Sequence, residues 1–148
     1  MTDIKIVTVY RVRTMVDPIS LAINEAHRSE HSTRHGAVVV KKGKVIQSGR
    51  NHYCSLQRIK HFQAKKIWSI HAEMNVLAGL PKKLTKGAEI YIVRVLRDGT
   101  LSNSKPCSIC MSIIRSAGIR RIFYSVDNNV FASSLVGEDR IGDCHSHT

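Results

Sequence analysis

Two short motifs that combine metal-ligating residue types constrain the fold of this chain most strongly. His71 and Glu73 stand at the start of one predicted helix, and Cys107 and Cys110 follow Pro106 at the start of another. Cysteines at positions i and i+3 are neighbours on one face of a helical turn, so their two thiolates can bind one Zn²⁺. If His71 is the third ligand, the fold must bring the starts of both helices together.

A His-Cys-Cys site of this kind leaves one zinc coordination position open. That arrangement is typical of catalytic zinc, because the open position holds a water whose pKa falls toward ~7. A helix N-terminus also lowers the pKa of a thiol and favours its anion. A carboxylate beside the metal can take the proton of the water. Glu73 is the candidate, since no other acidic residue lies between Glu30 and Glu89.

The same ligand types allow other arrangements. A closed, structural zinc site would need a fourth ligand, for which His52, Cys54 and His61 are candidates. Taken alone, the spacing of Cys107 and Cys110 also fits half of a structural site or a redox pair.

Length and composition set the class of the chain. Its 148 residues suffice for one domain, and we expect a core over residues 17–127 and a tail over 128–148. No apolar run approaches the ~20 residues that span a bilayer. The N-terminal residues carry no signal-peptide core, so we expect a cytoplasmic protein whose four cysteines are reduced and available to a metal.

The charge of the chain is strongly positive. It has 23 Lys and Arg against 11 Asp and Glu, a net charge of +12. Residues 31–72 contain no acidic residue and hold these basic ones: Arg34, Lys41, Lys42, Lys44, Arg50, Arg58, Lys60, Lys65 and Lys66. Concentrated positive charge indicates a phosphate-bearing partner, either a nucleotide or a polynucleotide. A basic surface that only increases solubility is the alternative.

Local patterns predict the order β-α-β-β-α-β-α-β. We expect strands over residues 4–12, 36–42, 44–49, 88–96 and 120–126 and helices over residues 18–31, 70–80 and 107–118. Asp17 and Pro18 are typical of a helix start, and Lys42-Gly43 is typical of a hairpin turn. Residues 50–70 are either a long loop or a short helix. This order fits a mixed sheet with helices packed on it.

Read together as HAE and PCSIC, the two motifs resemble the H-x-E…P-C-x-x-C signature of the zinc-dependent cytidine and deoxycytidylate deaminase superfamily. The resemblance covers residues 17–127, and histidine as first ligand is similar to the deoxycytidylate, tRNA-adenosine and polynucleotide branch. It implies a three-layer α/β/α fold with a mixed, roughly five-stranded sheet, and a homo-oligomer. The interval between the motifs is somewhat longer than is typical, and the extra length lies in residues 94–105.

The resemblance also implies an activity, the hydrolytic deamination of a cytosine base to uracil with one catalytic Zn²⁺ and no redox cofactor. His71, Cys107 and Cys110 are the implied zinc ligands. Zinc-bound hydroxide would attack the ring carbon that bears the amino group. Glu73 would move the proton to the ring nitrogen and then to the departing ammonia.

Three further positions are implied to contact the substrate. Asn51 falls where the family has an asparagine that hydrogen-bonds the sugar or base, although a turn residue after a strand is the plain alternative. Ala72 would offer a backbone group to the base edge. Tyr124 could stack on the base, with core packing as the alternative.

The substrate is the least determined part of the hypothesis. The +12 charge and the aromatic residues Tyr53, Phe62 and Trp68 among lysines and arginines favour single-stranded DNA, RNA or tRNA. The chain lacks an appended nucleic-acid module and a Ser-Trp-Ser run before its Pro-Cys, which favours a nucleotide such as deoxycytidine monophosphate (dCMP). The tRNA-adenosine branch of the family that the chain resembles usually has a small residue after the second cysteine, so Met111 favours cytosine over adenine.

We therefore expect a cytosine nucleotide deaminase. A polynucleotide cytidine or adenosine deaminase that binds through residues 31–72 is the alternative. A zinc-stabilised, basic nucleic-acid-binding module without catalysis is a third reading, against which the carboxylate of Glu73 argues.

Overall fold

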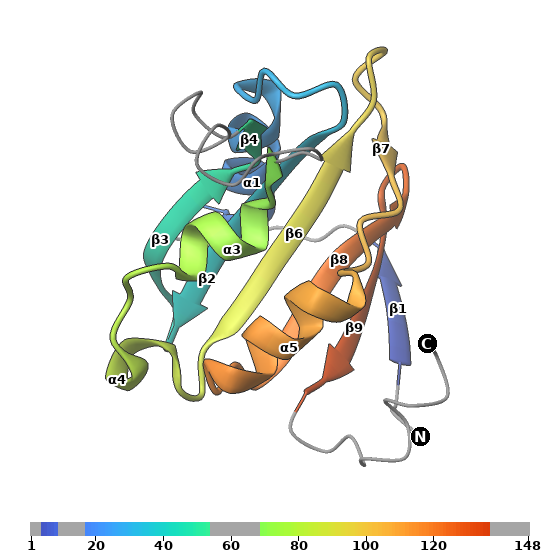
Figure 1. The fold of residues 1–148 in the computed structure, drawn as a ribbon. Coiled ribbons are helices and arrows are strands. Elements are labelled where there is room, and N and C mark those ends of the chain that lie inside the picture. The colour runs from blue at the N-terminus through green and yellow to red at the C-terminus, as the bar shows by residue number, and fades with distance from the viewer. Residues whose placement is uncertain (1–3, 9–16, 54–68, 137–148) are drawn as a thin grey trace.

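The computed structural model describes residues 4–8, 17–53 and 69–136 (Figure 1). Its main sheet has the order β1-β9-β8-β6-β2-β3, with β7 pairing to β6, and β4 pairs with β5. The strands are β1 (Ile4–Thr8), β2 (Arg34–Lys41), β3 (Lys44–Arg50), β4 (His52–Tyr53), β5 (Ser69–Ile70), β6 (Glu89–Val95), β7 (Leu101–Ser102), β8 (Arg121–Asp127) and β9 (Val130–Leu135). The helices are α1 (Pro18–His27), α3 (Ala72–Leu77), α4 (Lys82–Thr85) and α5 (Ser108–Ser116).

The architecture is a mixed sheet between two layers of helices. Strands β6 and β8 are parallel, and the other described pairs of the main sheet are antiparallel. Helix α1 covers one face, while α3 and α5 lie on the other (Figure 1). The predicted three-layer α/β/α fold is confirmed. None of the helices in the described ranges has the length and apolar character needed to cross a membrane.

Local signals account for the first helix and the first hairpin. The side chain of Asp17 accepts a hydrogen bond from the backbone N–H of Ile19 at 3.1 Å, which caps α1 as predicted. Lys42 and Gly43 have φ values of 51° and 77°, so both central residues of the β2–β3 turn adopt the left-handed conformation. The hairpin predicted at this pair is confirmed.

Some elements differ from the prediction. Helix α1 ends at His27 instead of continuing to residue 31, because Ser29 turns inward and its hydroxyl donates to Asn51. Strand β9 lies within the range assigned to a tail, and β7 forms within the long interval before Cys107. These two strands bring the main sheet to seven. Residues 9–12 of the first predicted strand and residues 54–68 of the predicted loop lie outside the described residues.

Gly36 on β2 marks the closest approach of α1 to the sheet. A Cβ atom at this position would lie 2.0 Å from the carbonyl oxygen of Ala22 and 2.8 Å from the backbone nitrogen of Ala26. Since both atoms belong to the helix backbone, no side-chain rotation can relieve the contact. Only glycine fits between α1 and β2.

Gly36→Ala is expected to lower the free energy of unfolding by about 2–3 kcal/mol, because α1 must move away from the sheet. Urea unfolding followed by circular dichroism measures the change. Gly43→Ala is the matched control, because nothing lies near its Cβ position and only its positive φ is strained. It should cost about 1 kcal/mol. An equal loss in both variants would contradict the close packing at Gly36.

Candidate active site

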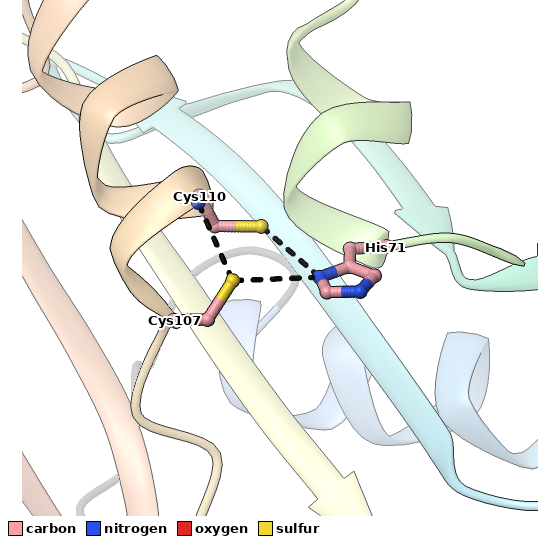
Figure 2. A group of neighbouring side chains, drawn as sticks. All are labelled: His71, Cys107 and Cys110. Carbon is pink, nitrogen blue, oxygen red and sulfur yellow. Dashed lines mark hydrogen bonds between the residues drawn. The ribbon is translucent and has the colours of Figure 1, made fainter. Parts of the chain in front are cut away.

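Three potential metal ligands meet where two helices begin on the same face of the sheet. His71 precedes the first residue of α3, Cys107 precedes α5, and Cys110 lies in the first turn of α5. The Nδ1 atom of His71 is 3.2 Å from the Sγ of Cys110 and 3.9 Å from the Sγ of Cys107 (Figure 2). The structure thus brings together the three residues that the motifs predict.

The donor set fits zinc. Tetrahedral bonds of ~2.3 Å to sulfur and ~2.1 Å to nitrogen place neighbouring ligand atoms about 3.5–3.8 Å apart. The ligand atoms of His71, Cys107 and Cys110 lie within 4.8 Å of one another. Among the described residues this group has three members, so it leaves a fourth position open. Cys54 and His61, two candidates for a closed site, lie outside the described residues, and His52 is exposed and not in the group.

The thiol of Cys110 is harder to ionise than a free thiol in the absence of a cation. Burial raises the pKa of the Cys110 thiol, and negative charge on Glu73 and Cys107 acts in the same direction. A bound metal reverses this situation, because a coordinating thiol is deprotonated outright. A divalent cation would compensate the negative charge that Glu73, Cys107 and Cys110 carry when they are ionised side by side.

Glu73 lies two residues after the histidine ligand, in the first turn of α3. Its side chain is 4% exposed, and it lines the same cavity as His71 and Cys107. Burial raises the pKa of Glu73, while His71 and a hydrogen bond with Cys110 partly oppose the rise. A carboxyl whose pKa is raised holds a proton more readily than an exposed one, which is a property of groups that move protons.

A cavity of about 180 Å³ opens beside the ligands. Its wall consists of His31, Thr33, His35, Asn51, Ser69, His71, Ala72, Glu73, Ser104, Lys105 and Cys107. The α1–β2 connection, the end of β3, the start of α3 and the loop before α5 all contribute to this wall. The cavity therefore joins segments from across the chain at the metal-ligand group.

Asn51 lines the cavity, and its side chain also holds the wall together. Its Oδ1 accepts from the hydroxyl of Ser29 at 2.7 Å and from the backbone N–H of His35 at 3.0 Å, and its Nδ2 donates to the carbonyl of Thr33 at 2.6 Å. The amide has two N–H groups, and the described residues use one. Asn51 is thus a buried cross-link, with one donor that the described residues leave unused. A turn residue after a strand, the alternative reading, would not need these bonds.

The other two predicted substrate contacts fall in different places. Ala72 is the first residue of α3, and it lines the cavity. Tyr124 is 6% exposed and belongs to the core cluster between the sheet and α3 and α5. It is not among the residues of the cavity wall, as the packing alternative for this residue anticipates.

Several residues of the wall carried no signal in the sequence motifs. His31, Thr33 and His35 lie in the connection before β2 and at its start, and they reach the site because Asn51 binds this segment. Ser104 and Lys105 stand immediately before Pro106 and Cys107. Their closeness to this motif is the feature of the sequence that could have predicted their place in the cavity wall.

The stability of the protein is expected to fall as the pH falls from about 6.5 to about 4. Burial lowers the pKa of His35 to about 4, whereas an unfolded histidine titrates near ~6.5. In this window the unfolded chain binds a proton that the folded chain does not, which lowers stability by about 3 kcal/mol in total.

Urea unfolding of the zinc-free protein across this window measures the effect. His35→Gln should flatten the pH dependence. His27→Gln, at an exposed position on α1, is the control and should retain it. Parallel pH profiles for all three proteins would contradict the assignment to His35.

Known proteins resemble the chain in sequence and in fold. The family model described as the cytidine and deoxycytidylate deaminase zinc-binding region matches residues 14–126. The apo dCMP deaminase from cyanophage S-TIM5 has a TM-score of 0.53 at 21% identity, over 74% of this chain and 79% of that chain. No curated protein is a significant sequence match.

Two further solved structures show weaker likeness. The cyanophage S-TIM5 dCMP deaminase in complex with dCMP and dUMP has a TM-score of 0.44 at 20% identity, over 69% of this chain and 76% of that chain. RibD from Acinetobacter baumannii, form 2, has a TM-score of 0.46 at 18% identity, over 73% of this chain and 27% of that chain.

Proposed function

Because the chain belongs to the cytidine and deoxycytidylate deaminase zinc-binding family and carries its deaminase domain, we propose that it deaminates the cytosine base of a nucleotide such as dCMP. Water would add to the ring carbon that bears the amino group, the bond from this carbon to the amino nitrogen would break, and the uracil nucleotide and ammonia would leave. The observation that carries the proposal is the buried carboxyl of Glu73 in the same cavity as two of the three metal ligands.

The roles of the chain's own groups follow from their places. When bound, zinc supplies a Lewis acid that makes water a nucleophile near neutral pH. The carboxyl of Glu73 would take one proton from this water and deliver it to the ring nitrogen, and would then move the second proton of the water, from the added hydroxyl, to the leaving amino group. Its burial in the cavity that two of the metal ligands also line supports this role.

The walls of the cavity orient the base. The N–H of Asn51 that the described residues leave unused can donate to the sugar or the base. The backbone N–H of Ala72 belongs to the first turn of α3, where helical N–H groups have no intrahelical acceptor. Both residues line the cavity, and their N–H groups would hold the base with its amino-bearing carbon toward the metal ligands.

Charge placement favours a nucleotide over a polynucleotide. In the described part of the basic stretch, the side chains of Arg34, Lys41 and Arg50 bond to Leu96, Lys83 and Glu25 of the protein itself. Lys42 and Lys44 lie at the hairpin turn, and β3 separates that turn from Asn51 by seven residues, or about 20 Å. These described cations therefore do not form a track into the cavity.

The polynucleotide reading keeps two observations in its favour, the +12 charge of the whole chain and the aromatic residues Tyr53, Phe62 and Trp68 among its basic residues. Four cations of the basic stretch lie outside the described residues: Arg58, Lys60, Lys65 and Lys66. A single substrate phosphate does not require so large a surplus. The functional test must therefore include a single-stranded oligonucleotide as a second substrate.

The test is uracil formation by zinc-loaded protein, with dCMP and a cytosine-containing single-stranded oligonucleotide offered in parallel and Glu73→Ala as the blank. We expect turnover of dCMP. Turnover of the oligonucleotide alone, weakening steeply with salt, would replace the proposal by the polynucleotide alternative. If uracil formation from both substrates equals that of the Glu73→Ala blank, the proposed cytosine deamination is overturned.

A further inference from the structure

The loop that leads into α5 is held in one place by hydrogen bonds. The Oδ1 of Asn103 accepts from the backbone N–H of Lys105 at 2.9 Å. The backbone N–H of Ser104 donates to the carbonyl of Ser125 on β8 at 2.8 Å. Lys105 therefore has a defined backbone position, two residues before the metal ligand Cys107.

A buried pair of serine side chains fixes this loop further. The hydroxyl of Ser104 donates to the carbonyl of Ile92 at 2.9 Å and accepts from the backbone N–H of Ser125 at 2.9 Å. The hydroxyl of Ser125 donates to the carbonyl of Ser102 at 2.6 Å and accepts from the backbone N–H of Arg94 at 3.2 Å. Ser104 and Ser125 are 3% and 0% exposed. A fully bonded buried network of this kind is rigid.

The side chain of Lys105 has no partner among the described residues. It is exposed, it lines the cavity, and its hydrogen bond within the described part of the chain comes from its backbone. The one carboxylate of the cavity wall, Glu73, is almost completely buried. The rim of the cavity thus carries a positive charge that no group in the described part of the chain compensates.

The size of the cavity determines which part of a substrate meets this charge. About 180 Å³ is less than the ~300–1,000 Å³ of pockets that enclose a whole small ligand. With the base inside beside Glu73 and the metal ligands, the rest of a nucleotide must lie at the rim. An ammonium group at the rim, on a flexible stem with three donors, suits a phosphate.

We propose that Lys105 is a specificity-determining residue that binds the phosphate of the substrate and so makes the site prefer a nucleotide to a nucleoside. This proposal rests on the proposed deaminase function. The hydrogen-bonded loop positions the residue, and its ammonium group, which has no partner among the described residues, attracts the phosphate.

Lys105→Met is the main test. It is expected to lower kcat/KM for dCMP by about tenfold, because a charged hydrogen bond at an exposed rim is lost. The value for deoxycytidine should change by less than about threefold, since that substrate has no phosphate. The ratio of the two values is the readout, and in the wild-type protein it should also fall with added salt. Lys105→Arg should restore most of the preference for dCMP.

Lys44→Met is the matched control, because it removes the same charge from an exposed position at the far end of β3. Its substrate ratio should equal that of the wild type. An equal loss for dCMP and deoxycytidine in Lys105→Met would show a structural role only and overturn the proposal. A loss confined to the oligonucleotide would also overturn it.

A binding measurement separates this proposal from the proposed function. Calorimetry with dUMP and deoxyuridine on the zinc-loaded Glu73→Ala protein needs no turnover. When Lys105→Met is added to the Glu73→Ala protein, the dissociation constant of dUMP should rise about tenfold and that of deoxyuridine should not change. If the wild type prefers dUMP but turns over neither cytosine substrate, the deaminase assignment fails while the phosphate site stands. If the wild type binds dUMP and deoxyuridine equally, the phosphate site fails by itself.

Discussion

Glu73→Ala is expected to lower kcat by about 10²- to 10⁴-fold, the range that a general acid–base group contributes. Alanine cannot move a proton between water and the base, and it removes no predicted zinc ligand. The variant should therefore hold one zinc per chain and melt cooperatively. Uracil formation, metal content by mass spectrometry and thermal circular dichroism measure the three properties.

A second carboxylate provides the control for Glu73→Ala. Glu89 on β6 pairs with Arg120 at 2.7 Å and is not part of the cavity wall. Glu89→Ala should keep its turnover within about twofold, because an exposed ion pair contributes little to stability. If Glu73→Ala retained a tenth or more of the wild-type kcat, the role assigned to this carboxyl would be wrong.

Cys107→Ala should lose zinc as well as activity. Removal of a hydrogen-bonding partner of a zinc ligand typically weakens binding 10–100-fold, so loss of a ligand itself should exceed about 100-fold. Competition with a chromophoric chelator measures the zinc affinity. The fall in kcat then follows from the empty site and should be reversed in part by excess zinc.

Ile109→Ala is the control, because Ile109 lies between the two cysteine ligands and is 62% exposed. It should bind zinc as the wild type does. If Cys107→Ala bound one zinc with unchanged affinity, the ligand set would have to include a residue other than His71, Cys107 and Cys110. Cys54 would then be the first residue to test.

The parts of the fold that the sequence predicted have local causes. Asp17 caps α1 through a side chain two residues from its partner. Lys42 and Gly43 set the hairpin through their own backbone conformation. The ligand group was predictable for a related reason, because helix starts place His71, Cys107 and Cys110 at known points of two elements.

The parts that the sequence did not predict depend on distant partners. Strand β9 pairs with β1 and β8, and its serines break the apolar pattern of a buried strand. The cavity wall around His31 and Thr33 forms because Asn51, about 20 residues away along the chain, binds this connection. Tyr124 could not be assigned from its position near a strand end, since only the packing of α3 and α5 places it in the core.

The position of the zinc ligands on two separate helices has a thermodynamic consequence. His71 and Cys107 are 36 residues apart, so the unfolded chain does not preform the site, and the metal cross-links α3 to α5 only in the folded state. Above its dissociation constant, each tenfold rise in free zinc adds about 1.4 kcal/mol to the stability of the fold. The melting temperature would then rise with the logarithm of the free zinc concentration, so the stability of the fold would report how much free zinc is present.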